Sequence, residues 1–305
     1  MAKLPLAASS VAIVLAVGYS QWFKQSAPSL PVFEEVRPSL YRLNYDWHMM
    51  PLFPPVPVAI WLVEASTLSS PKSWILIDAG TDDLSSKEAI LQGVKSKLSS
   101  AGGRLKVILL THGHKDHTGA LTRLLQTYPD AKVVYHQDEE PFISGGGQYS
   151  DLEGDHWVYN LARKALPPSH FATNTSLLPS NEAIKLQGSS GDLSTYITWL
   201  SKDFLKFYAV PGHTPGMVAF YHKPTKSVIA GDSFMHISAW FPVSNTRSIV
   251  PGNPAGPVTQ SLKRTKESQQ MLAAIPDART YFSSHDAHVG LSAEAFRKFV
   301  SSSSE

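Results

Sequence analysis

Three histidines and an aspartate lie within one short segment, "THGHKDH" (Thr111–His117), although the whole chain of 305 residues has only 12 histidines. Imidazole nitrogens and carboxylate oxygens are common ligands of zinc and other borderline divalent ions. A loop with His-x-His-x-Asp-His spacing can turn alternate side chains toward two neighbouring points. The segment therefore predicts a metal site formed by these four residues: His112, His114, Asp116 and His117.

Three further potential ligands follow apolar runs elsewhere in the chain. His213 comes just after "FLKFYAV", Asp232 ends "SVIAGD", and His285 ends "RTYFSSH". Each apolar run reads as a buried strand. Loops at the ends of strands are where α/β proteins gather their functional groups, because the sheet fixes the base of each loop. We therefore expect these side chains to join the first four.

The predicted ligands form two sets that share one carboxylate. The first set is His112, His114 and His213, and the second is Asp116, His117 and His285. Asp232 has two carboxylate oxygens and is expected to bridge the two metals. Two ions about 3.5–4 Å apart can hold a hydroxide that attacks a carbonyl or phosphoryl centre. Asp116 is the predicted catalytic residue, both a ligand and a proton acceptor that relays a proton to the leaving group. The expected cofactor is Zn²⁺, two ions per chain, with iron or manganese as alternatives.

Several neighbouring residues have two interpretations. His288 competes with His285 as the last ligand. Asp78, which ends the apolar run "SWILID", is either a strand terminator or helix cap, or an acceptor that orients a ligand histidine. His236, Trp240 and Phe241 line a substrate pocket or belong to the core.

The remaining pattern predicts one α/β domain. Apolar runs rich in β-branched residues predict strands at 56–65, 73–80, 105–111, 131–136, 196–200, 204–210, 217–223, 227–232 and 279–284. Helical spacing and stop signals predict helices at 86–103, 119–129, 156–166, 259–274 and 293–300. Residues 145–190 are rich in Gly, Ser, Pro and Asn and are expected to form an insertion or flap. This order suits two sheets packed face to face, with helices outside.

Composition narrows the function further. The chain has no cysteine, so a disulfide scaffold, a thiolate metal site and a cysteine nucleophile are excluded. The net charge is +2, from 27 basic and 25 acidic residues, and no basic stripe suggests a nucleic-acid partner. The expected partner is a small-molecule substrate.

The N-terminus predicts export or membrane insertion. Residues 4–23 carry no charge and lie between Lys3 and Lys24. We interpret 1–24 as a signal peptide or membrane anchor, 25–38 as a linker, and 39–305 as the hydrolase domain. This interpretation predicts a membrane-anchored or secreted protein that contacts the membrane through the N-terminal segment. The alternative is a buried N-terminal helix.

The segments "THGHKDH", "PGHTPG", "GDSF" and "SSH" together resemble the ligand motifs of the metallo-β-lactamase superfamily, in order and over roughly 56–288. The resemblance implies an αβ/βα four-layer sandwich of two mixed β-sheets flanked by helices, with a two-metal site at one edge. It also makes Asp78 the residue that orients a ligand histidine. Within the superfamily, the aspartate at 232 disfavours β-lactamases, and the histidine at 114 disfavours di-iron redox members.

With those two branches disfavoured, the chain resembles the lactonase, thioesterase and glutathione-thioester hydrolase branches of the superfamily. Acyl-homoserine lactonases often carry a tyrosine shortly after the bridging aspartate, whereas this chain has Phe234, Met235 and His236. Only 20 residues follow His285, where a glutathione-thioester hydrolase has a helical domain. The resulting hypothesis is a dinuclear metal hydrolase that cleaves an ester, lactone, thioester or lactam of a small molecule. The alternatives are a mononuclear iron dioxygenase or redox member, and a membrane-tethered metal-binding protein without catalysis.

Overall fold

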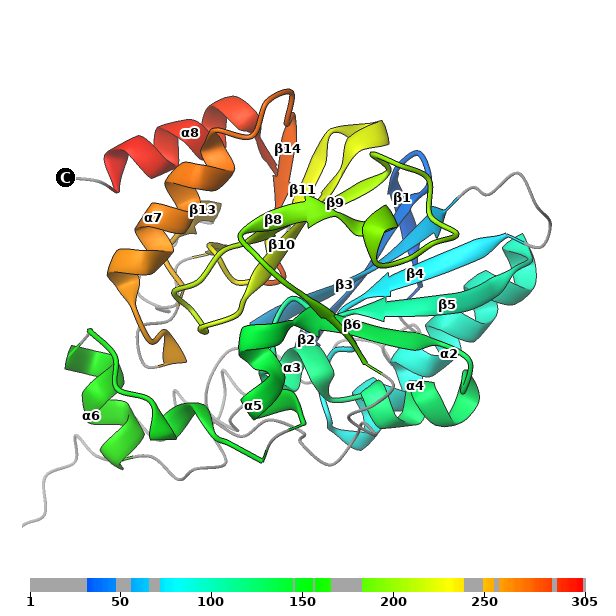
Figure 1. Ribbon diagram of the computed structural model, residues 1–305, viewed down its shortest axis with the longest axis horizontal. Helices are drawn as coiled ribbons and strands as arrows, with labels where there is room; N and C mark the ends of the chain where they lie inside the picture. Colours follow the sequence, from blue (N-terminus) through cyan, green and yellow to red (C-terminus); the bar gives the residue numbers. More distant parts are fainter. Residues whose placement is uncertain are drawn as a thin grey trace, which may run out of the picture. The chain divides into compact units, whose positions relative to one another are not determined.

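Two mixed β-sheets form the framework of the protein in the computed structural model (Figure 1). The structure describes residues 32–47, 56–65, 72–144, 146–155, 157–165, 183–238, 249–254, 258–286 and 290–303. The chain from Val32 to Glu305 forms one compact unit.

The first sheet contains seven strands in sequence order. They are β1 (Glu34–Arg37), β2 (Leu40–Trp47), β3 (Val56–Ala65), β4 (Ser73–Ile77), β5 (Arg104–Leu109), β6 (Lys132–His136) and β7 (Ile184–Leu186). Strands β1 to β4 pair antiparallel, and β4 to β7 pair parallel. The parallel strands therefore end at one edge of the sheet, where the loops after β4 and β5 meet.

The second sheet has six strands and includes one parallel pair. In spatial order they are β15 (Leu291–Ser292), β14 (Thr280–Phe282), β11 (Ser227–Ile229), β10 (Val218–His222), β9 (Leu205–Ala209) and β8 (Ser190–Asp192). Strands β11 and β14 pair parallel. In a separate two-stranded sheet, β12 (Met235–Ser238) pairs antiparallel with β13 (Ile249–Gly252).

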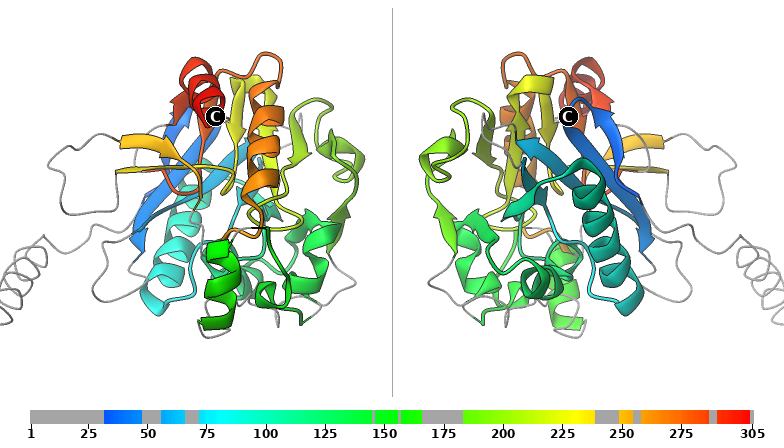
Figure 2. Two further views of the ribbon diagram at one scale, coloured as in Figure 1. Left: turned by 90° about the vertical axis from the view of Figure 1, so that its left-hand side faces the viewer. Right: turned by 90° about the vertical axis from the view of Figure 1, so that its right-hand side faces the viewer.

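The helices and short helical turns connect these strands. The helices are α2 (Leu84–Ala101), α3 (Lys115–Thr118), α4 (Leu121–Thr127), α5 (Glu140–Ile143), α6 (Trp157–Ala165), α7 (Leu262–Ala273) and α8 (Ala293–Ser302). The 3₁₀ turns are η1 (Gln137–Glu139), η2 (Tyr149–Asp151), η4 (Leu193–Thr195) and η5 (Lys223–Thr225). Figure 2 shows α7 in front of one sheet and α2 in front of the other, so helices cover both outer faces.

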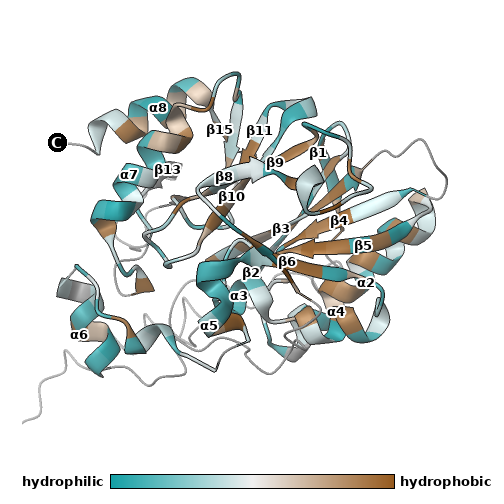
Figure 3. Ribbon diagram, in the orientation of Figure 1, coloured by the Kyte–Doolittle hydropathy of each residue, from teal (hydrophilic) through white to brown (hydrophobic). Residues whose placement is uncertain are grey.

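Three apolar layers hold the sandwich together. Between the sheets, Trp61 of β3 packs against Phe282 of β14 with ring centroids 4.7 Å apart. The outer face of the first sheet buries Leu76 beneath helix α2, which contributes Ile90. On the second sheet, Tyr281 stacks on Phe296 of α8 with ring centroids 4.1 Å apart. Strands buried on both faces need nearly continuous apolar sequence, which Figure 3 shows as brown in β5. The expected four-layer fold is confirmed.

Some expected elements differ from the observed ones. Residues 196–200 were expected to form a strand but follow η4 as turns, and their apolar pattern arises because Ile197 and Leu200 are buried in the core between the sheets. Residues 34–37 were assigned to the linker, yet they form β1 and pair with β2. The expected insertion holds η2 and α6.

The expected membrane-anchored or secreted location is contradicted. Within the described part of the chain, no helix combines the length and apolar character needed to cross a bilayer. The longest helix there, α2, has 18 residues, among them Lys87, Glu88, Lys95 and Lys97. The expected signal or anchor at 1–24 lies outside the described residues, and a membrane contact through it has no support.

Candidate metal centre

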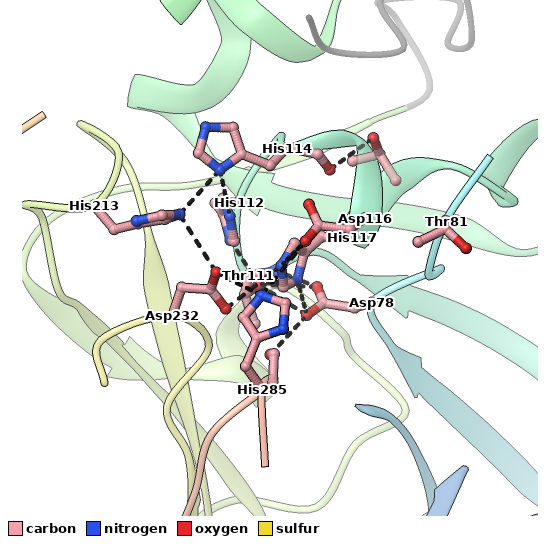
Figure 4. A network of polar contacts seen from close by, with 12 residues as sticks. Asp78, Thr81, Thr111, His112, His114, Asp116, His117, His213, Asp232 and His285 are labelled. Carbon is pink, nitrogen blue, oxygen red and sulfur yellow. Dashed lines mark hydrogen bonds and ion pairs between the residues drawn. The ribbon is translucent and has the colours of Figure 1, made fainter. Parts of the chain in front are cut away.

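The ends of strands from both sheets converge on one cluster of histidines and aspartates (Figure 4). The residues come after β5, β9, β11 and β14, and each is buried or nearly so. All seven predicted ligands belong to the cluster: His112, His114, Asp116, His117, His213, Asp232 and His285. Asp116 and His117 lie on the short helix α3, and not in a loop as was expected from the spacing.

The first predicted set, which we call the three-histidine set, consists of His112, His114 and His213. His112 Nε2 lies 3.1 Å from His114 Nδ1, and His114 Nδ1 lies 3.0 Å from His213 Nε2. The three rings meet edge to face, with centroids 4.7–5.0 Å apart. Three imidazole nitrogens therefore face one point.

The second predicted set, together with the shared aspartate, is called the mixed set and consists of Asp116, His117, Asp232 and His285. His285 Nε2 lies 3.4 Å from Asp116 Oδ2 and 3.1 Å from Asp232 Oδ2. His117 Nε2 lies 3.7 Å from Asp116 Oδ2 and 3.5 Å from Asp232 Oδ1. Two imidazoles and two carboxylates alternate around this point.

One carboxylate connects the two sets. Asp232 Oδ2 lies 3.4 Å from His213 Nε2 as well as 3.1 Å from His285 Nε2. Asp232 is therefore at the position expected of a residue that bridges two ions.

The outward nitrogen of most of these rings has a partner in the protein. His285 Nδ1 donates to the carbonyl of Pro57 at 2.9 Å, so its Nε2 faces the cluster. His213 Nδ1 contacts the hydroxyl of Thr259 at 2.9 Å. His112 Nδ1 contacts the hydroxyl of Thr111 at 3.1 Å. Such outer partners fix the tautomer and orientation of metal-ligating histidines.

Asp78 orients His117. His117 Nδ1 donates to Asp78 Oδ2 at 2.9 Å, while the amide of Thr111 donates to Asp78 Oδ1 at 2.8 Å. Asp78 adopts a left-handed backbone with φ of 62°, directly after β4. The residue that caps α2 is Asp83, which accepts from the amide of Ser86. The helix-cap interpretation of Asp78 is therefore wrong.

The three-histidine set is electrically neutral at pH 7. Burial, together with the neighbouring imidazoles, holds the pKa of His112 well below its usual value. Burial and the adjacent His213 lower the pKa of His114 to about 3. Burial lowers the pKa of His213 to about 4. Neutral imidazole is the form that binds metal.

In the mixed set, by contrast, the pKa values of the histidines are raised. Burial disfavours the charged form of His285, but Asp232 and Asp116 outweigh it and raise its pKa to about 10. The same balance raises the pKa of His117 well above its usual value. In return, His117 and His285 hold the pKa of both Asp116 and Asp232 well below the usual range, despite burial. Without metal, this set is a network of ion pairs.

The donor chemistry fits divalent metal ions. His117 Nε2 and Asp232 Oδ1 are buried and have no hydrogen-bond partner. Buried polar atoms without partners are rare in proteins. In the three-histidine set, His114 Nδ1 lies 3.1 Å from His112 Nε2 and 3.0 Å from His213 Nε2, so one cation would satisfy all three neutral rings. Histidine and aspartate without thiolate suit zinc, iron or manganese.

Several supporting residues were not anticipated from sequence. The partner of His213, Thr259, is 46 residues away in the chain, and the partner of His285 is a backbone carbonyl 228 residues away. Neither contact leaves a local sequence signal. His236 is buried beside Asp286, whereas His288, Trp240 and Phe241 lie outside the described residues.

The comparison with known families now has a structural context. The sequence pattern that defines the Metallo-beta-lactamase superfamily matches residues 53–285, which include the whole cluster. The chain belongs to the metallo-β-lactamase superfamily. The resemblance inferred from the motifs is thereby confirmed.

Curated members of the superfamily share moderate identity with this chain. A probable metallo-hydrolase of Bacillus subtilis, YflN, is 32% identical over 171 residues, covering 55% of this chain and 58% of that protein. A hydroxyacylglutathione hydrolase of Crocosphaera subtropica is 25% identical over 146 residues, covering 48% of this chain and 40% of that protein. The chain spans about half the length of the curated relatives it matches first.

Solved superfamily structures share the fold at low identity. An archaeal superfamily protein from Sulfolobus tokodaii has a TM-score of 0.55 at 19% identity, covering 88% of this chain and 86% of that one. The metallo-β-lactamase FIM-1 from Pseudomonas aeruginosa has a TM-score of 0.58 at 15% identity, covering 90% and 96%. These likenesses establish the fold of this superfamily member.

Proposed function

We propose that this chain is a hydrolase that uses two divalent metal ions to cleave the acyl bond of a small-molecule thioester, lactone or ester. The observation that carries the proposal is the convergence of two donor sets on one shared carboxylate, Asp232. The named activity of the hydroxyacylglutathione hydrolases places thioesters first among substrates to test.

The residues expected to hold the metals follow from the two sets. His112, His114 and His213 would hold one ion, and Asp116, His117 and His285 the other, with Asp232 shared. When bound, two such ions activate water near neutral pH and polarise the substrate carbonyl. Zinc is the expected metal, because three neutral imidazoles and mixed imidazole–carboxylate sets are typical zinc ligands.

Hydrogen bonds behind the ligand histidines hold their rings in place. His112 and His213 are held from behind by hydroxyl groups, and His285 by a backbone carbonyl, so little reorganisation accompanies substrate binding. Asp78 keeps the Nε2 atom of His117 directed at the cluster.

Asp116 is proposed to move the proton. Its side chain is 13% exposed, compared with 5% for Asp232, so it is the more accessible of the two carboxylates in the mixed set. A carboxylate at this position can accept a proton from the attacking water and return it to the departing oxygen or sulfur. A thiolate leaving group needs this proton less than an alkoxide does.

The test uses the full chain loaded with Zn²⁺. Metal content is measured by mass spectrometry, and hydrolysis is measured with S-lactoylglutathione, γ-butyrolactone, p-nitrophenyl acetate, a chromogenic cephalosporin and bis-p-nitrophenyl phosphate. We expect two zinc ions per chain and turnover of at least one of the thioester, lactone and ester substrates, abolished by a chelator and restored by Zn²⁺.

Three results contradict the proposal. Turnover that persists in the metal-free chain excludes a metal-dependent reaction. Hydrolysis of the phosphodiester alone assigns a different bond. One iron per chain with oxygen consumption favours the mononuclear iron alternative.

A further inference from the structure

A second buried carboxylate lies next to the centre without belonging to either donor set. Glu139, at the end of the turn η1 that follows β6, is fully buried. Its four hydrogen-bond donors are all uncharged. The amide of Gly113 donates to Oε2 at 2.9 Å, and the hydroxyl of Tyr149 donates to the same oxygen. The hydroxyl of Thr214 and the amide of Gly216 each donate to Oε1 at 2.7 Å.

Three of these donors, Gly113, Thr214 and Gly216, belong to the two loops that carry the three-histidine set. Gly113 lies between His112 and His114 in the chain, and Thr214 follows His213 directly. One oxygen of Glu139 therefore holds the first loop and the other oxygen holds the second. The two loops are about one hundred residues apart in sequence, and this carboxylate spans them.

Glycine allows the close approach to Glu139 and Tyr149 at two positions. A Cβ atom added to Gly113 would lie 2.6 Å from the Tyr149 hydroxyl oxygen. A Cβ atom added to Gly216 would lie 2.7 Å from the amide nitrogen of Glu139. The glycines of "HGH" and "HTPG" thus allow both loops to approach the same side chain, a feature of these motifs that metal ligation alone leaves unexplained.

Tyr149 connects the same carboxylate to a ligand ring. It comes from η2, and its ring meets that of His114 edge to face, with centroids 4.6 Å apart. Tyr149 therefore contacts both the carboxylate and one of the three histidines. Its hydroxyl also accepts from the amide of Gly113 at 3.0 Å.

Burying a carboxylate without a cation is unfavourable unless its oxygens are hydrogen-bonded. Burial raises the pKa of Glu139, and the four donors oppose that rise. Apolar residues of similar volume would fill the space at lower cost, but they could not bind two backbone amides and two hydroxyls at once. The arrangement is specific to holding two loops at a fixed separation.

We propose that Glu139, together with Tyr149 and Thr214, is a positioning residue for the three-histidine set: it fixes the His112–His114 loop against the His213 loop, so that the three nitrogens converge on one metal ion. The proposal rests on the proposed function for the presence of that ion. Glu139 itself touches no atom of the ligand rings in any hydrogen bond, and acts through the backbone between them.

Glu139→Gln is the decisive variant. Glutamine keeps the shape but replaces one acceptor oxygen with an NH₂ donor, which faces either the Gly113 and Tyr149 pair or the Thr214 and Gly216 pair. We expect the affinity of the full chain for the first equivalent of Zn²⁺ to fall by about 10- to 100-fold, as for other outer partners of metal ligands. We also expect a shifted visible spectrum of the Co²⁺-substituted chain. A competition titration with a chromogenic chelator measures the affinity.

Glu140→Gln is the matched control. Glu140 is the next residue and also carries hydrogen bonds, but its partners are Tyr135 at 2.6 Å and Lys185 at 2.9 Å, outside the cluster. We expect unchanged Zn²⁺ affinity and an unchanged Co²⁺ spectrum. Equal behaviour of Glu139→Gln and Glu140→Gln overturns the positioning role.

Two further outcomes distinguish a failure of the positioning role from a failure of the proposed function. If the unmodified chain binds Zn²⁺ but hydrolyses no acyl substrate, the proposed function fails, while weakened binding in Glu139→Gln still supports positioning. If the unmodified chain binds no Zn²⁺, both fail. If Glu139→Gln does not fold, Tyr149→Phe replaces it, with an expected loss of about tenfold in affinity and no change as the contradicting result.

Discussion

The two halves of the centre are neighbours, yet they hold opposite charge states. In the three-histidine set the pKa of every imidazole is lowered, to about 3 for His114 and about 4 for His213. In the mixed set the pKa of His285 is raised to about 10, because two carboxylates face it. Similar depth of burial thus has opposite results, decided by whether carboxylates or imidazoles are adjacent.

This difference separates two ways of preparing a metal site. The three-histidine set has only nitrogen lone pairs directed at one point, held by hydrogen bonds behind the rings. The mixed set forms ion pairs between protonated histidines and carboxylates when no metal is present, so a metal must displace protons before it binds. The three-histidine set is expected to bind a metal ion first. The mixed set is expected to bind one only when the pH is high enough for its histidines to lose their protons.

Removing the shared carboxylate should have the largest effect. Asp232→Asn keeps the shape but weakens both sets, since Asp232 Oδ2 faces His213 and His285 together. We expect turnover of the best acyl substrate to fall by about 1000-fold, the scale of losing a group that acts with others as one unit. We also expect fewer than two zinc ions per chain by mass spectrometry. Two tightly bound ions with normal turnover would show that the carboxylate does not connect the sets.

The pH dependence of metal binding should distinguish the sets next. His117 and His285 must each lose a proton to bind metal, whereas the three-histidine set is already neutral at pH 7. The affinity for the second equivalent of Zn²⁺ should therefore rise about 100-fold per pH unit between pH 7 and 9, with the first equivalent nearly constant. Calorimetry in buffers with different heats of ionisation counts the protons released. Equal proton release on binding the first and the second Zn²⁺ would contradict the assignment of the protonated histidines to the second site.

A change confined to one set should be smaller. Asp78→Asn removes the charge that orients His117, and it reaches the three-histidine set only indirectly, through the Thr111 hydroxyl that contacts both Asp78 and His112. We expect the affinity for the second Zn²⁺ to fall by about 10- to 100-fold, and that for the first to fall less. Glu139→Gln is expected to show the reverse pattern, so the two variants form a pair. If both variants weaken the same equivalent more strongly, the division into sets is wrong.

The smallest effect concerns the stability of the metal-free chain. Below pH 6.5, His114 and His213 become protonated in the unfolded chain but stay neutral in the folded chain, because burial lowers their pKa. The free energy of unfolding therefore decreases as the pH falls toward about 4. Above pH 6.5 the folded chain keeps the proton on His285 that the unfolded chain has lost, so stability decreases again as the pH rises toward about 10.

Urea unfolding should therefore give a maximum near pH 6.5 for the metal-free chain. In His285→Gln the decrease on the alkaline side should be shallower than in the unmodified chain. An alkaline limb of the same steepness in both chains would show that His285 does not hold its proton.

The sequence predicted the cluster better than the parts around it. His112, His213, Asp232 and His285 each follow an apolar run that forms a buried strand, and such runs are strong signals. Glu139 was missed, because a single glutamate three residues after β6 looks like any solvent-exposed charge, and its partners come from three separate segments. The strand expected at 196–200 failed, since burial of a turn produces the same apolar pattern.

The short strands at the sheet edges show the same limit. β1 and β7 have four and three residues, respectively, and owe their conformation to the neighbouring strand that each one pairs with. Local propensity says little about such segments. The register of a long neighbour, which a sequence does not display, determines where they begin and end.

The origin of the donor atoms in two different sheets has a consequence for folding. His112 and His117 follow a strand of the first sheet, whereas Asp232 and His285 follow strands of the second. Neither half of the chain alone can assemble a complete set. Each ion bound by the folded chain therefore adds its binding free energy to the association of the two halves. The loaded chain is expected to unfold in a single transition at a temperature that increases with the concentration of free metal.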